Sequence, residues 1–162
     1  MKSLDLTRGY IGKQETTQNR GPVIDAIADA LNVPRANSWC GQFVAWILMR
    51  AYCKDKTDLR KRLGFTSPWF CDSTKDWKAQ ATRLGMLTAT PEAGDVFILL
   101  DGNREAHHIG FVVAPPDATG RFQTVEGNTN AGGSVNGDGV YNRTRTANGS
   151  VIFIALPKEL KA

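Results

Sequence analysis

Residues 37–48, NSWCGQFVAWIL, place a cysteine at the start of an apolar run. From position 43 onward the apolar residues recur at helical spacing, which predicts a helix with one buried face, and Asn37 or Ser38 is placed to cap it. Cys40 then lies at the helix N-terminus, where a thiolate is stabilised. A free cysteine is also a common buried hydrophobic residue. Other residues of the chain are needed to decide whether the Cys40 thiol is reactive or structural.

The bulk composition is ordinary for a soluble globular protein: of 162 residues, 41% are hydrophobic and 22% are charged. We expect one domain over residues 1–162. No apolar stretch approaches the roughly 20 residues of a membrane span, and residues 1–18 lack a signal-peptide core, so we expect synthesis in the cytoplasm and no stable membrane association. The three cysteines, Cys40, Cys53 and Cys71, do not suggest a disulfide framework. The net charge of +4 favours an acidic partner, but no basic stripe with interleaved aromatics points to nucleic acid.

Helical patterns come first and strand patterns second. The helical stretches are residues 21–33, 39–53 and 72–85, and the β-prone runs are residues 95–100, 108–114, 121–127, 139–145 and 150–156. This order predicts an α+β fold, with N-terminal helices packed on an antiparallel sheet of five to six strands. The longest irregular stretch, residues 128–139, is rich in glycine and suits a substrate-facing loop.

The chain contains two histidines, His107 and His108, at the start of a β-prone run. A nucleophilic cysteine needs a base within hydrogen-bond reach, so the base has to be one of this pair. Side chains alternate along a strand, which predicts that one ring faces the helices that carry Cys40 and the other faces away. Glu126 and Asn128 are candidates for the third group, which orients the imidazole. A carboxylate in that role is expected to accept the Nδ1 proton.

Three motifs, SWCGQFVAWIL, HHIGFVV and VEGNTN, in this order resemble those of the CHAP domain, the cysteine- and histidine-dependent amidohydrolase/peptidase family of papain-like cell-wall peptidases. The resemblance extends to YIGKQETTQNRGP and to PEAGDVFIL, in which Ala93 replaces the usual proline. Matched residue by residue, it implies Cys40 as the nucleophile, His108 as the base and Glu126 as the orienting carboxylate. Asn128 falls where the family has a further polar active-site residue.

The resemblance also implies a papain-like fold and hydrolysis of peptidoglycan through an acyl-enzyme, as an amidase or endopeptidase acting on the stem peptide. We expect no cofactor and no metal. The stretch LNVPRANSWC lacks the acidic calcium-binding loop of some members, and Cys71, His107 and His108 lack the spacing of a zinc site. Trp39 is a candidate substrate-binding residue beside Cys40, although a tryptophan is more often a core residue. His107 is expected to face solvent.

The biological setting is left open by the sequence. We expect a monomeric phage or bacterial lysin that is released through a holin and acts on the cell wall, in the periplasm or outside the cell. One alternative is a toxin that a secretion system delivers and an immunity protein neutralises. Another is a module that binds wall peptides without cleaving them, against which the intact Cys40, His108 and Glu126 motifs argue.

Overall fold

The computed structural model describes residues 2–129, 132 and 137–161, so positions 130–131 and 133–136 of the glycine-rich stretch lie outside the described residues. Helices occupy the first half of the chain and strands the second, which confirms the predicted α+β class. In chain order the elements are α1 (Lys2–Arg8), α2 (Pro22–Leu31), α3 (Cys40–Tyr52), α4 (Lys56–Leu63), the 3₁₀ turn η1 (Phe70–Asp72), α5 (Thr74–Arg83), β1 (Leu87–Thr88), β2 (Val96–Leu100), β3 (Ala106–Ala114), β4 (Arg121–Thr129), β5 (Gly139–Thr146), β6 (Val151–Ile154) and the 3₁₀ turn η2 (Lys158–Leu160).

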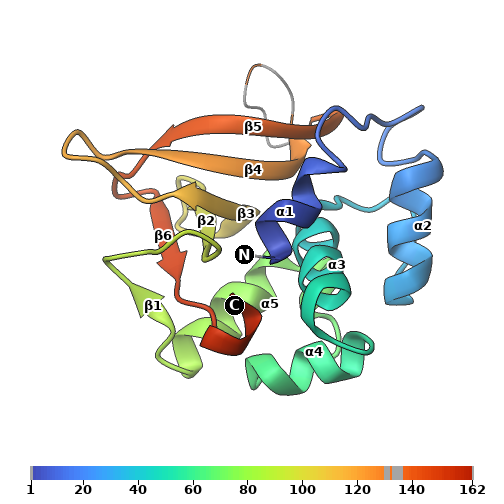
Figure 1. Cartoon of the computed structure of the whole chain (residues 1–162), viewed down its shortest axis with the longest axis horizontal. Helices are drawn as coiled ribbons and strands as arrows, with labels where there is room; N and C mark the ends of the chain where they lie inside the picture. The colour runs from blue at the N-terminus through green and yellow to red at the C-terminus, as the bar shows by residue number, and fades with distance from the viewer. Residues whose placement is uncertain (1, 130–131, 133–136, 162) are drawn as a thin grey trace.

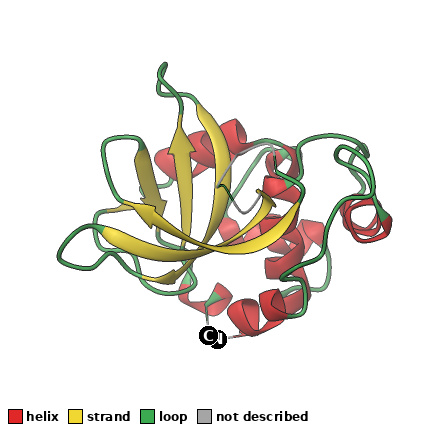
Figure 2. Ribbon diagram, turned by 90° about the horizontal axis from the view of Figure 1, so that it is seen from above, coloured by secondary structure: helices red, strands yellow, loops and turns green. Residues whose placement is uncertain are grey.

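The six strands form one antiparallel sheet in the order β1-β6-β2-β3-β4-β5. The sheet is strongly curved and the helices gather on one side of it (Figures 1 and 2). This arrangement is consistent with a papain-like fold. Within the described residues, none of the helices is long and apolar enough to cross a membrane.

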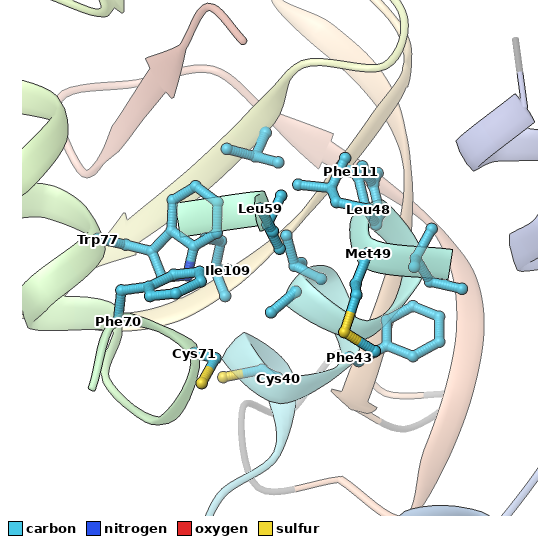
Figure 3. Packing of buried hydrophobic residues seen from close by; sticks show 14 of the residues in the cluster. Cys40, Phe43, Leu48, Met49, Leu59, Phe70, Cys71, Trp77, Ile109 and Phe111 are labelled. Carbon is cyan, nitrogen blue, oxygen red and sulfur yellow. The ribbon is translucent and has the colours of Figure 1, made fainter. Parts of the chain in front are cut away.

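Helix α3 is the centre of the helical layer. It contacts α1, α2, α4, η1 and η2, and it also contacts β3 and β4 of the sheet. Its side chains Phe43, Val44, Ile47 and Leu48 are fully buried, and each such burial contributes about 1.5–3 kcal/mol of transfer free energy. Figure 3 shows Cys40 at the edge of the apolar cluster that surrounds this helix. The packing therefore fixes the N-terminus of α3 against the sheet.

A second, smaller apolar cluster supports the sheet independently of the helical layer. Phe97, Val112, Phe122 and Phe153 form it, and the rings of Phe97 and Phe122 meet edge to face with centroids 5.4 Å apart. The ring of Phe97 also lies 6.3 Å from that of His108. The aromatic packing of this cluster thus bears directly on the orientation of one candidate catalytic residue.

Candidate active site

Cys40 is the first residue of α3 and is 3% exposed. The predicted capping by Asn37 or Ser38 is wrong: Trp39 occupies the N-cap position and no side chain caps the helix. Both candidate caps are engaged elsewhere, since Asn37 donates to a carboxylate and the Ser38 hydroxyl accepts from Asn128. The backbone N–H groups of Cys40, Gly41 and Gln42 precede the first bond of the helix, from the Phe43 amide to the Trp39 carbonyl, so they have no intrahelical acceptor.

His108 lies on β3, is fully buried, and has its Nε2 2.7 Å from Oε2 of Glu126. The expectation that Glu126 holds the Nδ1 proton is wrong, because the ring presents Nε2 to β4. A sequence cannot distinguish the two nitrogens, since the ring orientation depends on packing against neighbours such as Phe97. Nδ1 has no hydrogen-bond partner among the described residues. It is thus the nitrogen left to exchange a proton with Cys40.

The thiol and the imidazole shift each other's protonation. Burial raises the pKa of Cys40, but the interaction of the thiolate with the nearby imidazole of His108 outweighs it, with help from the Ser38 hydroxyl and the Ile109 amide, so the pKa is lowered. Burial lowers the pKa of His108, whereas Cys40 and Glu126 raise it, to about 9. Both directions favour a thiolate–imidazolium pair near neutral pH.

The other two cysteines have a different environment. Burial raises the pKa of Cys53 and of Cys71 to about 11 in each case. A thiol is a nucleophile only as the thiolate. Among the three cysteines, the surroundings therefore activate Cys40 alone, which answers the question that its position in the sequence raised.

Glu126 on β4 is fully buried and accepts four hydrogen bonds. Its Oε2 accepts from His108 and from Nη2 of Arg145 at 2.6 Å, and its Oε1 accepts from Thr124 at 2.5 Å and from Nε of Arg145 at 2.9 Å. Burial raises the pKa of Glu126, but Arg145 and His108 lower it to about 2. The carboxylate is therefore ionised at any pH at which the protein would act.

Sequence reasoning missed Arg145. It lies on β5 and its side chain is 17% exposed. The alternation of charged and polar residues in NRTRT is also that of an ordinary solvated strand face, so the sequence held no signal that separated Arg145 from a surface arginine.

Asn128 contacts Ser38 rather than the imidazole. Its Nδ2 donates to the Ser38 hydroxyl at 2.7 Å, and that hydroxyl lies 3.9 Å from the Cys40 sulfur. The pairing of β4 with β5 is irregular between Glu126 and Thr129, and Asn128 has a φ of 56°, a conformation that asparagine tolerates. The irregularity turns the amide toward the start of α3.

Trp39 is 1% exposed, so it does not line an open cleft as the sequence interpretation suggested. Its indole N–H donates to Oε1 of Glu15 at 2.6 Å, and its ring meets that of Phe43 edge to face. A Cβ on Gly127 would come within 2.7 Å of the same indole. Trp39 therefore packs against β4 and supports the strand that carries Glu126. Glu15 belongs to the N-terminal stretch YIGKQETTQ, which this contact ties to the site.

A pocket of about 230 Å³ opens beside the nucleophile. The start of α3 forms one wall, η1 and the start of α5 form the second, and the start of β3 forms the third. The lining residues are Ser38, Cys40, Gly41, Asp72, Ser73, Thr74, Lys75, Ala106 and His107.

His107 is exposed, as expected, but it lines this pocket instead of pointing away from it. The reason is a β-bulge: Leu99 of β2 pairs with His108, whereas Leu100 pairs with Ala106. His107 is therefore an extra residue on β3, and strict alternation does not apply at this point.

The zinc interpretation finds no support in the geometry. Cys71 is fully buried and His107 is exposed. Within residues 2–129, 132 and 137–161, no three histidine, cysteine, aspartate or glutamate side chains are grouped so as to hold a metal ion.

Comparison with known families identifies the chain. The CHAP domain model matches residues 32–128, more than half of the chain, and that range includes Cys40, His108 and Glu126. The chain belongs to the CHAP domain family. CHAP domains are cysteine/histidine-dependent amidohydrolase/peptidase domains, so the family resemblance inferred from the three motifs is confirmed. Arg145 of this CHAP domain lies outside the matched range. A comparison with curated proteins gives no match.

Proposed function

We propose that this CHAP domain is a cell-wall lysin that hydrolyses an amide or peptide bond of the peptidoglycan stem peptide, with Cys40 as the nucleophile. The observation that carries the proposal is the series of contacts that runs from the buried thiol through His108 to Glu126 and Arg145. Such a series activates a nucleophile and orients its base. Membership of an amidohydrolase/peptidase family supports amide hydrolysis as the reaction.

In the acylation step, the Cys40 thiolate attacks the carbonyl carbon and a C–S bond forms. The carbonyl oxygen becomes an oxyanion. The imidazolium of His108 then gives its Nδ1 proton to the leaving nitrogen, the C–N bond breaks, and an amine departs. Glu126 keeps the Nε2 proton in place throughout and stabilises the charged ring.

The oxyanion requires hydrogen-bond donors at the start of α3. The backbone N–H of Cys40 is one, because it has no intrahelical acceptor. We propose that the Ser38 hydroxyl is the second. Its oxygen accepts a hydrogen bond from Asn128, which leaves the hydroxyl hydrogen free to point to the other side, where Cys40 lies. Asn128 is then a positioning residue that acts through Ser38.

In the deacylation step, a water molecule attacks the thioester while Nδ1 of His108 accepts its proton. The C–S bond breaks and the carboxylic acid product leaves. The Cys40 thiolate is released and His108 is protonated, so the starting ion pair is restored. All of these proton transfers use groups on α3 and β3.

The test uses purified protein and purified peptidoglycan sacculi, with released fragments identified by mass spectrometry. We expect the wild type to release muropeptides that carry a new amino or carboxyl end, and Cys40→Ala to release none. Cys53→Ser is the matched control, since it removes a thiol from the other end of the same helix region and should keep full activity. The mass of the fragments identifies the bond.

Two outcomes would contradict the proposal. Equal release by the wild type and Cys40→Ala would exclude the thiol mechanism. A wild type that binds sacculi without releasing any fragment would instead indicate a module that binds wall peptides.

A further inference from the structure

Asp72 lines the Cys40 pocket from the 3₁₀ turn η1. Two neutral amides hold its carboxylate: Nδ2 of Asn37 donates to Oδ2 at 2.9 Å, and Nε2 of Gln42 donates to Oδ1 at 2.7 Å. Amide donors orient a carboxylate but do not neutralise it. The negative charge of Asp72 is therefore fixed in direction and uncompensated by these contacts.

The other charged groups around the pocket have opposite partners. Lys75, on the same wall, lies 3.0 Å from Glu105, and the Cys40 thiolate is offset by the imidazolium beside it. In the described part of the chain, no lysine, arginine or histidine forms an ion pair with Asp72. Asp72 supplies the carboxylate among the lining residues, since His107 carries no negative charge in either protonation state. Asp72 is thus the group of the lining that attracts a cation.

Gln42 indicates that the position of this carboxylate matters. The residue is 1% exposed, and its Oε1 has no hydrogen-bond partner in the described residues. An unpaired buried acceptor is unfavourable. The opposite orientation of the amide would place Oε1 against Oδ1 of Asp72, so the negative charge of Asp72 fixes the amide as it is. The protein thus retains a fixed carboxylate next to its nucleophile despite an unpaired acceptor in the core.

We propose that Asp72 binds a primary ammonium group of the substrate close to the scissile carbonyl. A pocket of about 230 Å³ has room for one amino-acid side chain or a chain end. The inference rests on the proposed function and names its substrate class: peptides that carry a free amine beside the bond to be cleaved. The amine can belong to a free amino terminus or to the side chain of a diamino acid.

The first experiment needs no peptidoglycan. In a Cys53→Ser background, Cys40 is modified with two methanethiosulfonates of similar size, the cationic aminoethyl reagent and the neutral propyl reagent. The ratio of the two rate constants, cationic over neutral, measures the preference for a cation. We expect Asp72→Asn to lower this ratio about five- to tenfold, because one nearby charge is removed. Asp5→Asn, the same change on exposed α1, is the control and should leave the ratio unchanged.

The rate with the neutral reagent reports whether Cys40 remains intact and reactive in each variant. An unchanged ratio in Asp72→Asn, with a normal neutral rate, would overturn the proposal. If Asp72→Asn does not fold, the ratio of rate constants of the wild type alone tests the proposal. This ratio, normalised to that of a small free thiol, should exceed one and fall toward one as salt is added. A ratio of one at low salt would equally overturn the proposal.

The second experiment distinguishes the two sources of the amine. Three synthetic stem peptides are compared: one with both amines free, one acetylated at its amino terminus, and one acetylated at its diamino-acid side chain. We expect one acetylation to lower kcat/KM of the wild type about tenfold, and Asp72→Asn to treat all three alike within about twofold. Cleavage of no peptide would count against the proposed function and leave the reagent test to decide on Asp72. Cleavage of all three at equal rates by the wild type would overturn the assignment of Asp72.

Discussion

Arg145 and Glu126 form a two-point ion pair directly behind the imidazole of His108, and one carboxylate oxygen, Oε2, is shared between the arginine at 2.6 Å and the histidine at 2.7 Å. The guanidinium keeps Glu126 ionised, which lets it hold the Nε2 proton. The same guanidinium also offsets part of the negative charge of Glu126, which would otherwise stabilise the imidazolium. We infer that the carboxylate contributes to catalysis both by orienting the ring and through the charge-assisted hydrogen bond that it accepts from Nε2.

Glu126→Gln should keep the shape of the site but lose the charge-assisted hydrogen bond to His108. Loss of such a bond costs about 1.5–3 kcal/mol, which is roughly one to two decades in kcat/KM. We therefore expect weak residual activity and, because a neighbouring carboxylate favours the imidazolium, a lower pKa for His108 in the pH–rate profile. Full activity with an unshifted profile would show that Glu126 is not the orienting group.

Arg145→Gln should lower kcat/KM about 5- to 30-fold, since Glu126 would lose both hydrogen bonds from the guanidinium. The loss of the positive charge raises the pKa of Glu126, so the acid limb of the pH–rate profile should move to higher pH. Arg145→Lys should restore the position of that limb in part, and Arg121→Gln, an exposed change on β4, is the control. Loss of thermal stability with an unchanged profile would assign Arg145 a purely structural role.

At high pH, the rate of substrate hydrolysis and the rate of Cys40 alkylation should change differently. His108, with a pKa raised to about 9, must be protonated to give its proton to the leaving amine, so hydrolysis should fall as the pH rises through about 9. The thiolate persists above that pH because the pKa of Cys40 is lowered. Inactivation by iodoacetamide, followed over the same range, should not fall. A parallel decline of both rates would mean that the two groups do not form an ion pair.

His108→Ala should lower kcat about 10²–10⁴-fold, as expected for loss of a general acid and base. His107→Ala should leave kcat within about threefold and act on KM instead, because His107 lines the pocket without contacting the ion pair. The two variants need steady-state kinetics on one peptide substrate. An equal loss of kcat in both would mean that the bulge at His107 brings the exposed ring into the reaction.

Ser38→Ala should lower kcat about 10²-fold, the lower end of the effect of removing one oxyanion donor, with a smaller change in KM. Asn128→Ala should cost less, because the hydroxyl remains but loses its orientation. The double variant should be no slower than Ser38→Ala alone, since Asn128 acts through Ser38. Additive losses would require a separate role for Asn128.

Gly127→Ala should destabilise the fold by at least about 1–3 kcal/mol, because its Cβ would come within 2.7 Å of both Phe43 and Trp39. Gly102→Ala is the matched control, since a Cβ there meets nothing within 4 Å. Urea unfolding of the two variants measures the difference. Equal midpoints would mean that β4 shifts away from α3 without cost.

Much of the fold could be predicted from the sequence wherever one pattern dominates. The apolar spacing of α2 and α3 and the alternation of β2 to β6 gave these elements within a few residues of their bounds. The helix predicted over residues 72–85 is α5, in which the Ser73 hydroxyl accepts from the Asp76 amide at the N-cap. The amphipathic pattern is weak where a helix is short or polar, which is why α1 and α4 were missed. In α4 only Leu59 and Leu63 are buried.

The site was predictable to the extent that chain order and residue type determine it. Two histidines and one cysteine at a helix start left few choices, and the structure brings Cys40, His108 and Glu126 together as expected. Three features depend on tertiary geometry and carried no sequence signal. They are the ring nitrogen that faces β4, the bulge at His107, and the reach of Arg145 from β5.

The wall of the pocket that faces Cys40 comes from residues 72–75, which contribute nothing to the thiol, imidazole and carboxylate. Under the proposal for Asp72, this wall helps to select the substrate, whereas the groups that break the bond lie on α3, β3 and β4. The wall and the start of α3 meet closely, because a Cβ on Gly41 would lie 3.1 Å from the carbonyl oxygen of Cys71, and Asn37 and Gln42 both donate to the Asp72 carboxylate. Phe70 and Cys71 anchor η1 in the core, whereas residues 72–75 are half-buried or exposed, so changes that leave the wall in place are confined to these four positions. If Asp72 selects the substrate as proposed, substitutions at these positions will change the range of accepted substrates while leaving Cys40, His108 and Glu126 in place.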